Sequence, residues 1–252
     1  MKWEAELDLA KTAARKAGNH LAGLLRDREK TILSNVGRDI KLQADRDSEA
    51  VILDLLATSE HPVLAEESGE DGVVANDPFW VVDPLDGTLN FSRGVPMNCV
   101  SIALCRGNEP LLGVVYDFNR GECYAGAAGE GAWLNDSRVS VSETRDRGKA
   151  ILATGFPVNR DFGSESLTAF IEQVRQFKKV RLFGSAALSL AYVACGRVDA
   201  YAEDNIMFWD VAAGAALVKA AGGYVDMSNS DSVKWGKVVR CASHAVIWIN
   251  EE

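Results

Sequence analysis

Residues 80–88 read Trp-Val-Val-Asp-Pro-Leu-Asp-Gly-Thr. The apolar, β-branched start predicts a buried strand, and this strand ends at two acids, Asp83 and Asp86. Pro84 fixes its own φ and opens a turn. Such a turn brings both carboxylates and the carbonyl of Leu85 toward one point, and hard divalent cations prefer an all-oxygen set of this kind. A strand followed by an ordinary Asx-type turn is the alternative interpretation.

The next two residues, Gly87 and Thr88, lie where a helix would begin. Backbone N–H groups at a helix start have no partner within the helix, so they can donate hydrogen bonds to an anion such as phosphate. The stretch therefore predicts an anion site directly beside the metal site.

Two further segments place acids at the ends of predicted elements. The pair Glu66 and Glu67 follows a short strand candidate, and Asp210 lies between the apolar pair Phe208–Trp209 and a predicted helix. A solvated acidic loop explains the first segment equally well. Asp210 is a good candidate for a helix N-cap. The cap role and a metal role are compatible, because a helix N-terminus favours a carboxylate.

Composition excludes several classes of protein. The chain has 252 residues, which fits one large domain or two small ones that share a core, and its formal net charge is -9. A net acidic protein lacks the positive surface that binds nucleic acid or anionic membranes, so neither is predicted as a partner. Because no apolar run approaches about 18 residues, no membrane span is predicted. An acidic protein that binds phosphate needs bridging cations, which points again to a metal.

Cysteine usage and the first residues suggest a compartment. The five cysteines are odd in number and form no Cys-x-x-Cys pair, which predicts reduced, mostly buried thiols in a cytoplasmic protein. The first ten residues carry three acids and no long apolar run, so they do not resemble a signal peptide.

The hydrophobic pattern changes along the chain. In the first part it predicts helices over 3–25 and 45–56, strands over 62–65 and 79–82, and several strands between 99 and 141. In the second part it predicts strands over 150–153, 180–183, 199–202 and 245–249 and at Val225, and helices over 165–177, 186–194 and 210–221. We predict an α+β half over 1–145 and an α/β half over 146–252, divided within the polar run at 142–149.

Taken together, the motifs resemble the inositol monophosphatase family over roughly residues 3–250. The matching residues are Asp45, then Glu66–Glu67, then Asp83-x-x-Asp86-Gly87-Thr88, then Gly184-Ser185-Ala186, Glu203 and Trp209–Asp210. The resemblance implies a layered α-β-α-β-α sandwich of the inositol monophosphatase and fructose-1,6-bisphosphatase type. It also implies a homodimer and hydrolysis of a small phosphorylated polyol or sugar, foremost inositol monophosphate, with two or three Mg²⁺ ions.

The resemblance also implies a role for each residue. One Mg²⁺ would be held by Glu66, Asp83 and the Leu85 carbonyl. A second would be held by Asp83, Asp86 and Asp210. Glu66 would also help to hold a third, weaker ion. Thr88, oriented by Asp45, would position the attacking water and help to deprotonate it, and Glu66 is counted with them as catalytic. The amides of Gly87 and Thr88 would bind phosphate. The substrate hydroxyls would face a further set of residues: Gly184, Ser185, Ala186, Glu203, Asp86 and Asp210.

One departure from the family pattern affects the weakest metal. The family has a threonine three residues before the position of Asp45, and this chain has Leu42. The missing hydroxyl is expected to loosen Asp45, and the cations of the loop at 34–41, Arg38 and Lys41, are expected to repel a nearby metal. Both effects predict millimolar Mg²⁺ dependence and weak inhibition by Li⁺.

Other readings of the motifs are weaker. A haloacid-dehalogenase-type phosphatase also has aspartates at a strand end, but there one residue separates them, whereas Pro84 and Leu85 separate Asp83 from Asp86. No GxxxxGK[ST] string of a P-loop enzyme occurs. A non-catalytic regulator would not need to retain every acid. Within the family, a fructose-1,6-bisphosphatase or another sugar, histidinol or nucleotide phosphatase is the alternative. Fructose bisphosphate is less favoured, because Arg160 is the single obvious contact for a second phosphate near 155–165.

Overall fold

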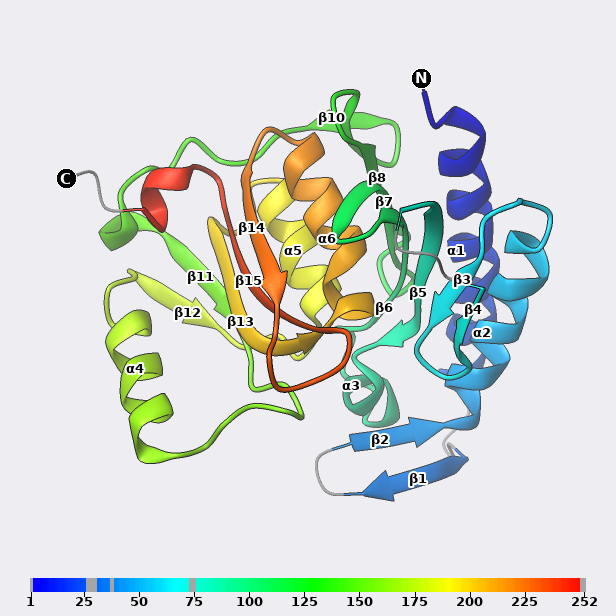
Figure 1. Cartoon of the computed structure of the whole chain (residues 1–252), viewed down its shortest axis with the longest axis horizontal. Coiled ribbons are helices and arrows are strands. Elements are labelled where there is room, and N and C mark those ends of the chain that lie inside the picture. The colour runs from blue at the N-terminus through cyan, green and yellow to red at the C-terminus, as the bar shows by residue number, and fades with distance from the viewer. Residues whose placement is uncertain (1, 26–30, 37–38, 73–75, 250–252) are drawn as a thin grey trace.

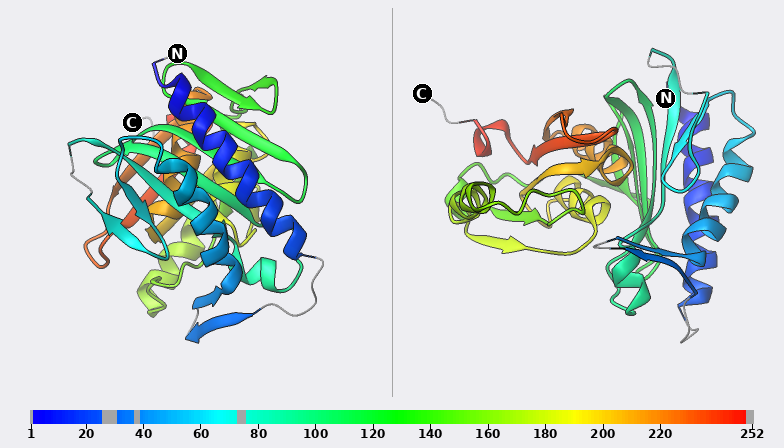
Figure 2. Two further views of the ribbon diagram at one scale, coloured as in Figure 1. Left: turned by 90° about the vertical axis from the view of Figure 1, so that its right-hand side faces the viewer. Right: turned by 60° about the horizontal axis from the view of Figure 1, so that its bottom comes forward.

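The structure, a computed structural model, describes residues 2–25, 31–36, 39–72 and 76–249. Helices and sheets alternate in five layers, as the views in Figure 1 and Figure 2 show. The layered α-β-α-β-α sandwich is confirmed. Its two sheets are held apart by a pair of buried helices, and the motif residues gather near that pair.

The first layer consists of α1 (Glu4–Leu24) and α2 (Gln43–Leu56), which cover one face of the larger sheet. The helical spacing of apolar residues explains this placement, because it puts one buried stripe along α1. The stripe consists of Leu7, Ala10, Ala13, Ala14, Ala17 and Leu21. Small alanines let the helix lie close against the sheet.

The larger sheet has eight strands in the order β10-β9-β8-β7-β6-β5-β3-β4. Only β3 and β5 pair in parallel; the other neighbours are antiparallel. The strands are β3 (Val63–Ala65), β4 (Gly69–Asp71), β5 (Pro78–Asp86), β6 (Cys99–Arg106), β7 (Glu109–Asp117), β8 (Glu122–Ala127), β9 (Gly131–Leu134) and β10 (Ser137–Val139). The strands predicted between 99 and 141 are therefore present. The central strand β5 is the one that carries the two aspartates.

The middle layer consists of α5 (Ala186–Ala194) and α6 (Phe208–Ala220), which are apolar around almost their whole circumference. Every residue of α5 is buried, because sheets lie on both sides of the pair. Gly113 of β7 allows a close approach of α6, since a Cβ at this position would lie 2.2 Å from the carbonyl oxygen of Ala213. The main hydrophobic core therefore joins both halves of the chain.

The smaller sheet has five strands in the order β12-β11-β13-β15-β14. They are β11 (Ile151–Thr154), β12 (Lys179–Arg181), β13 (Ala200–Met207), β14 (Tyr224–Asn229) and β15 (Gly236–Ala242). The last layer is α4 (Ser164–Val174), whose Val174 packs on the outer face of this sheet. The predicted division of the chain within 142–149 falls between β10 and β11, and it stays a prediction.

Two sequence-based assignments are wrong. The described residues of the segment 34–41 are not a loop: β1 (Ile32–Val36) and β2 (Asp39–Leu42) pair as an antiparallel hairpin. Residues 245–249 are not a strand but contain a 3₁₀ turn, η2 (Ala245–Ile247). A short apolar run does not distinguish a strand from a packed turn, and here Ile247 is buried while Trp248 Nε1 donates to the Cys241 carbonyl. Strand β15 was not predicted.

Candidate active site

Three aspartates, two from one turn and the third from far along the sequence, meet at one point. Asp83, Asp86 and Asp210 each place one carboxylate oxygen so that the three oxygens lie within 4.8 Å of one another. We call them the carboxylate cluster. Asp83 and Asp86 lie at the end of β5, where the pairing with β6 shifts register between them. This irregularity turns both side chains toward the same place and confirms that the Asp-Pro-Leu-Asp turn brings the two acids together.

Asp83 is almost fully buried, with 1% of its surface exposed. Its Oδ1 accepts a hydrogen bond of 2.9 Å from the backbone N–H of Leu85. Burial raises the pKa of Asp83 well above its ordinary value, and the carboxylates of Glu66 and Asp86 raise it further. A bound cation would reverse this effect, because it would offset the repulsion among the acids.

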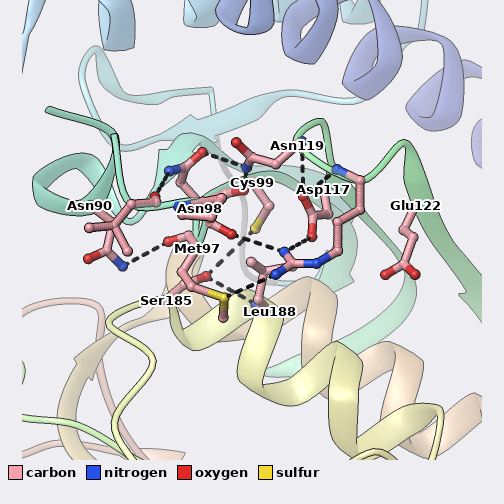
Figure 3. A network of polar contacts seen from close by, with 12 residues as sticks. Asn90, Met97, Asn98, Cys99, Asp117, Asn119, Glu122, Ser185 and Leu188 are labelled. Atoms are coloured by element: carbon pink, nitrogen blue, oxygen red, sulfur yellow. Dashed lines mark hydrogen bonds and ion pairs between the residues drawn. The ribbon is translucent and has the colours of Figure 1, made fainter. Parts of the chain in front are cut away.

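Asp86 connects the cluster to helix α5. Its Oδ2 accepts hydrogen bonds from the Ser185 hydroxyl at 2.5 Å and from the Ala187 N–H at 2.8 Å. Ser185 is itself the N-cap of α5 and accepts from the Leu188 N–H, a contact that Figure 3 includes. Burial raises the pKa of Asp86 to about 6, while the bond from Ser185 acts in the opposite direction. The end of β5 and the start of α5 are thus fixed to each other.

Asp210 is the third residue of α6, and the N-cap is Met207. The sequence-based assignment of Asp210 as an N-cap is therefore displaced by three residues. The Oδ2 of Asp210 accepts from the Met207 N–H at 3.3 Å, so the carboxylate still satisfies a donor at the helix start. The helix N-terminus and the cluster share this carboxylate.

Glu66 lies in the turn between β3 and β4 and lines the same cavity as Asp86 and Asp210. Its oxygen is not among the three that lie within 4.8 Å. Burial raises its pKa well above the ordinary value, and Asp210 and Asp45 raise it further. The neighbouring Glu67 forms an ion pair of 2.9 Å with Lys41.

Thr88 and Asp45 are in direct contact. The Thr88 hydroxyl lies 2.9 Å from Asp45 Oδ1 and 3.0 Å from the Leu85 carbonyl oxygen. Asp45 Oδ2 also accepts from the Leu42 N–H at 2.7 Å. Burial raises the pKa of Asp45 to about 6. The structure corrects the expectation that Leu42 loosens Asp45, because the backbone supplies the bond and the Leu42 side chain packs in the core.

The second cation expected near the weakest metal, Arg38, lies outside the described residues. The other, Lys41, lines the cavity and is paired with Glu67. Its charge is therefore already offset in part by a neighbouring acid.

Gly87 occupies a position that no other residue would fit. It has φ 88°, and a Cβ there would lie 2.7 Å from the carbonyl oxygen of Met97. It directly precedes α3 (Thr88–Ser92) and is the N-cap of that helix. The predicted helix start at Gly87–Thr88 is thus confirmed.

Asn90, which sequence reasoning missed, joins α3 to the segment before α5. Its Nδ2 lies 2.8 Å from the Met97 carbonyl oxygen, 2.9 Å from that of Phe183 and 3.2 Å from that of Gly184. Figure 3 shows the bond to Met97. Asn90 therefore sets the distance between the two segments that are predicted to bind the substrate.

A buried polar network supports the same region from behind (Figure 3). Asp117 is fully buried and forms an ion pair of 2.7 Å with Arg120. Arg120 also donates to the Pro96 carbonyl, and Asn119 donates to Asn98 Oδ1 at 3.0 Å. These bonds fix the segment that connects α3 to β6.

Glu203 lies on β13 and lines the cavity together with the acids. Burial, together with the nearby carboxylate of Asp210, raises its pKa to about 8. Gly155 leaves room for it, since a Cβ at Gly155 would lie 2.6 Å from Glu203 Oε1. Gly184 (φ 71°), Ser185 and Ala186 line the same cavity from the start of α5.

The cavity has a volume of about 610 Å³. It brings together all the predicted substrate residues: Asp86, Gly87, Thr88, Gly184, Ser185, Ala186, Glu203 and Asp210. It also contains residues that no motif indicated: Leu89, Phe156, Pro157, Val158, Asn159, Asn205, Ile206 and Met207. Of these residues, Asn205 is unusual in its backbone, with a positive φ of 61°. The sequence alone does not indicate this conformation.

A family model described as the inositol monophosphatase family matches residues 2–247. The chain belongs to the inositol monophosphatase family. The inositol monophosphatase from Anabaena (Nostoc) sp. PCC 7120 superimposes with a TM-score of 0.83 at 38% identity, covering 98% of this chain and 94% of that one. The resemblance found from the sequence is thus confirmed.

Curated relatives carry a different name. The Nus factor SuhB of Xylella fastidiosa is 41% identical over 225 residues, which span 87% of this chain and 81% of the relative. The Nus factor SuhB of Escherichia coli K12 is 41% identical over 223 residues, covering 87% and 84%. A structure of Mycobacterium tuberculosis SuhB superimposes with a TM-score of 0.75 at 31% identity, covering 95% and 89%.

Two further predictions concern thiols and membranes. The five cysteines are free, and all but Cys195 are buried. In the described part of the chain no helix has both the length and the apolarity that a membrane crossing requires. The predictions of a homodimer and of a cytoplasmic location stay predictions.

Proposed function

We propose that this chain is a Mg²⁺-dependent phosphatase that hydrolyses a small phosphate monoester of a polyol or sugar, with inositol monophosphate as the first candidate. One observation carries the proposal. Two members of the carboxylate cluster, Asp86 and Asp210, line the same cavity as the helix start at Gly87 and as Thr88, which is hydrogen-bonded to Asp45. A metal-binding group, a water-activating group and an anion-binding group are therefore placed together.

The donor set fits Mg²⁺. Buried acids that raise one another's pKa form an all-oxygen site whose negative charge calls for a divalent cation. Asp83, Asp86 and Asp210 would hold one ion, and Glu66 with Asp83 and the Leu85 carbonyl a second. When bound, such ions acidify water and stabilise the charge on the attacking and leaving oxygens.

The chain's own residues would perform the remaining tasks. The Thr88 hydroxyl has contacts with Asp45 and with the Leu85 carbonyl, and it donates its one hydrogen to Asp45. A lone pair of Thr88 Oγ1 can then accept a proton from the attacking water. Asp45, with a pKa of about 6, is a suitable acceptor for the proton that Thr88 gives up near neutral pH. The amides of Gly87 and Thr88 would bind the phosphate oxygens. Glu203 would bind a hydroxyl of the leaving alcohol.

A bisphosphate is a weaker candidate substrate. Arg160, the expected contact for a second phosphate, is absent from the described residues that line the cavity and instead stacks over Phe156 and Phe170. Among those lining residues the cation is Lys41, which is paired with Glu67. The site therefore supports a monophosphate better than fructose 1,6-bisphosphate.

The test is the release of inorganic phosphate from a panel of monoesters: inositol 1-phosphate, glycerol 3-phosphate, histidinol phosphate, adenosine monophosphates and fructose 1,6-bisphosphate. We expect release that needs Mg²⁺ and that ends when EDTA is added. An Asp210→Asn variant with normal folding is the matched control. Turnover that is equal with and without Mg²⁺ would refute the metal assignment, and no turnover of any ester would refute the phosphatase.

A second candidate is a regulatory role, which is favoured by the 41% identity to proteins named Nus factor SuhB. The two roles are separable in one experiment. An Asp83→Asn variant would lose phosphatase activity, yet it should keep a regulatory function that depends on the surface of the protein. A regulatory function that is lost together with turnover would instead tie it to the catalytic site.

A further inference from the structure

The cavity contains a part that the proposed chemistry does not use. Among the apolar residues that line it, we call four the apolar wall: Leu89, Phe156, Pro157 and Val158. Leu89 is 56% exposed, Phe156 37% and Val158 51%. Exposed apolar side chains that line a concave site next to polar groups are typical of ligand pockets, where they contact the apolar part of the ligand.

The central ring of the wall is held in place although it is exposed. Phe156 stacks on Phe162 with ring centres 5.8 Å apart and planes 27° apart, and its centre lies 5.0 Å from that of Phe170. The Arg160 guanidinium lies 5.3 Å from the centre of Phe156 and 4.5 Å from that of Phe170. Such stacking and cation–π contacts restrict the ring before any ligand arrives.

The segment that carries the ring is also anchored. Residues 155–163 connect β11 to α4, and in Figure 1 this segment runs below β13 toward α3. Asn205 Nδ2 donates to the Asn159 carbonyl at 3.3 Å, and the Ser230 hydroxyl bonds to Asn205 Oδ1 at 2.5 Å. Asn205 holds a positive φ of 61° at the irregularity in the pairing of β13 and β15. A fixed wall can select among ligands.

The chemistry of the wall indicates its ligand. Hydroxyl groups need hydrogen-bond partners when they leave water, and the side chains of the apolar wall offer none. A flat apolar ring instead gains from contact with Val158, Leu89 and the exposed part of the Phe156 ring. The volume of about 610 Å³ falls among clefts that hold ligands larger than a six-carbon polyol phosphate.

We propose that the apolar wall selects the leaving alcohol, and that beside inositol monophosphate the site accepts monoesters whose alcohol carries an aromatic or heteroaromatic ring and prefers them to esters of small acyclic polyols. The inference rests on the proposed phosphatase function. Phe156 acts as the specificity residue, because its partly exposed ring lines the cavity. The phosphate would lie at Gly87 and Thr88, and the ring would lie against Phe156 and Val158.

The test compares two primary alkyl phosphates, 2-phenylethyl phosphate and sn-glycerol 3-phosphate, on the Mg²⁺-loaded enzyme. We expect kcat/KM to be about tenfold higher for the phenylethyl ester, although it has no hydroxyl for Glu203. Phe156→Ala should reduce this preference about fivefold or more, a loss typical of one apolar pocket contact. The loss should appear mainly as a higher KM for the phenylethyl ester, since the contact of its ring with Phe156 is equal in the ground state and the transition state.

Ile171→Ala is the matched control, because Ile171 is an exposed apolar residue of α4 outside the cavity lining. It should leave both values of kcat/KM unchanged. A wild type that does not prefer the phenylethyl ester, or a Phe156→Ala variant that keeps the full preference, would overturn the inference. Inositol 1-phosphate serves as a third substrate: its hydrolysis would show that the phosphatase stands when the specificity proposal fails. No release from any of the three would refute both.

Discussion

The carboxylate cluster and the apolar wall meet at one cavity, which Asp86 and Asp210 of the cluster line, but the two are built in opposite ways. The cluster lies at a strand end and a helix start, buried between the two sheets and tied by hydrogen bonds to Leu85, Ser185, Ala187 and Met207. The wall lies mainly on a connecting segment, exposed, and is held by ring stacking. Groups that perform charge chemistry need fixed positions and little water, whereas groups that choose a leaving alcohol need to be reachable.

Mutations in the two regions should therefore have different consequences. A change in the cluster should act on turnover with every substrate. A change in the wall should act on the ratio between substrates. The predictions below test this division, beginning with the strongest effect.

Asp83→Asn should lower kcat at least about a thousandfold, because it removes a negative ligand at the centre of the site. The variant should fold normally and, without Mg²⁺, melt at the same temperature as wild type or higher. The reason is that Asp83 is buried against Glu66 and Asp86, so neutralising it relieves repulsion. Phosphate release and thermal melting by circular dichroism measure the two effects.

The control for Asp83→Asn is Asp226→Asn, an exposed acid on β14. It should change neither kcat nor the melting temperature. A cluster variant that retains activity within about tenfold of wild type would contradict the role of the cluster, since an interaction with a bridging charge is worth several kcal/mol.

Sequence reasoning located the cluster because its residues occur at ends of elements with a strong hydrophobic pattern. The buried strand before Asp83 and the helix after Asp210 are both apolar on every side, so their ends are easy to place. Paired spacings such as Asp83 and Asp86 then restrict the geometry further. Periodicity likewise placed most helices and strands, whereas the layered arrangement was expected from the family resemblance.

The apolar wall left no comparable signal. Phe156 and Val158 lie in a segment without periodicity, and their position in the cavity depends on a tertiary contact, the bond from Asn205 to Asn159. The β1–β2 hairpin was missed for a similar reason, because only its pairing with itself and not an apolar pattern defines it. Asn90 acts across 94 residues of sequence, which no local pattern reveals.

Lys237 is buried beside the start of α6, the helix that carries Asp210 of the cluster. It is 1% exposed, its Nζ donates to Asn108 and Asn229, and it lies 4.4 Å from the ring centre of Phe208, the first residue of α6. Burial lowers its pKa to about 8, and Cys105 acts in the opposite direction. Between pH 8 and an ordinary lysine pKa of about 10.4, the unfolded chain therefore holds a proton that the folded chain lacks.

This difference makes the folded state gain stability as pH rises through that window, and the contribution is lost as pH falls toward 8. Relative to Lys237→Met, wild type should gain on the order of 2 kcal/mol in unfolding free energy between pH 8 and pH 10. Urea unfolding at both pH values measures it. A constant difference between the two proteins would show that Lys237 stays protonated on its amide partners.

Asn90→Ala should loosen the contact between α3, which begins after Gly87, and the start of α5. Loss of its bonds to the Met97 and Phe183 carbonyls should lower kcat/KM about tenfold for all esters, because a misplaced binding group weakens transition-state contacts. Ser92→Ala, on the same short helix, is the control, since Ser92 bonds only to its own helix. An equal loss in both variants would point to general destabilisation of α3.

Lys41→Met should produce the smallest effect, on Mg²⁺ affinity. Lys41 lines the cavity, pairs with Glu67 at 2.9 Å and lowers the pKa of Glu66. Removing this cation leaves a more negative site, so half-maximal activity should need roughly two- to fivefold less Mg²⁺, and added salt should shrink the difference. Lys11→Met, which removes a surface pair with Asp8 on α1, should leave the Mg²⁺ requirement unchanged. A higher requirement in Lys41→Met would mean that the pair with Glu67 matters more for placing the Glu66 turn than for its charge, and the metal site would then depend on the β1–β2 hairpin for its geometry.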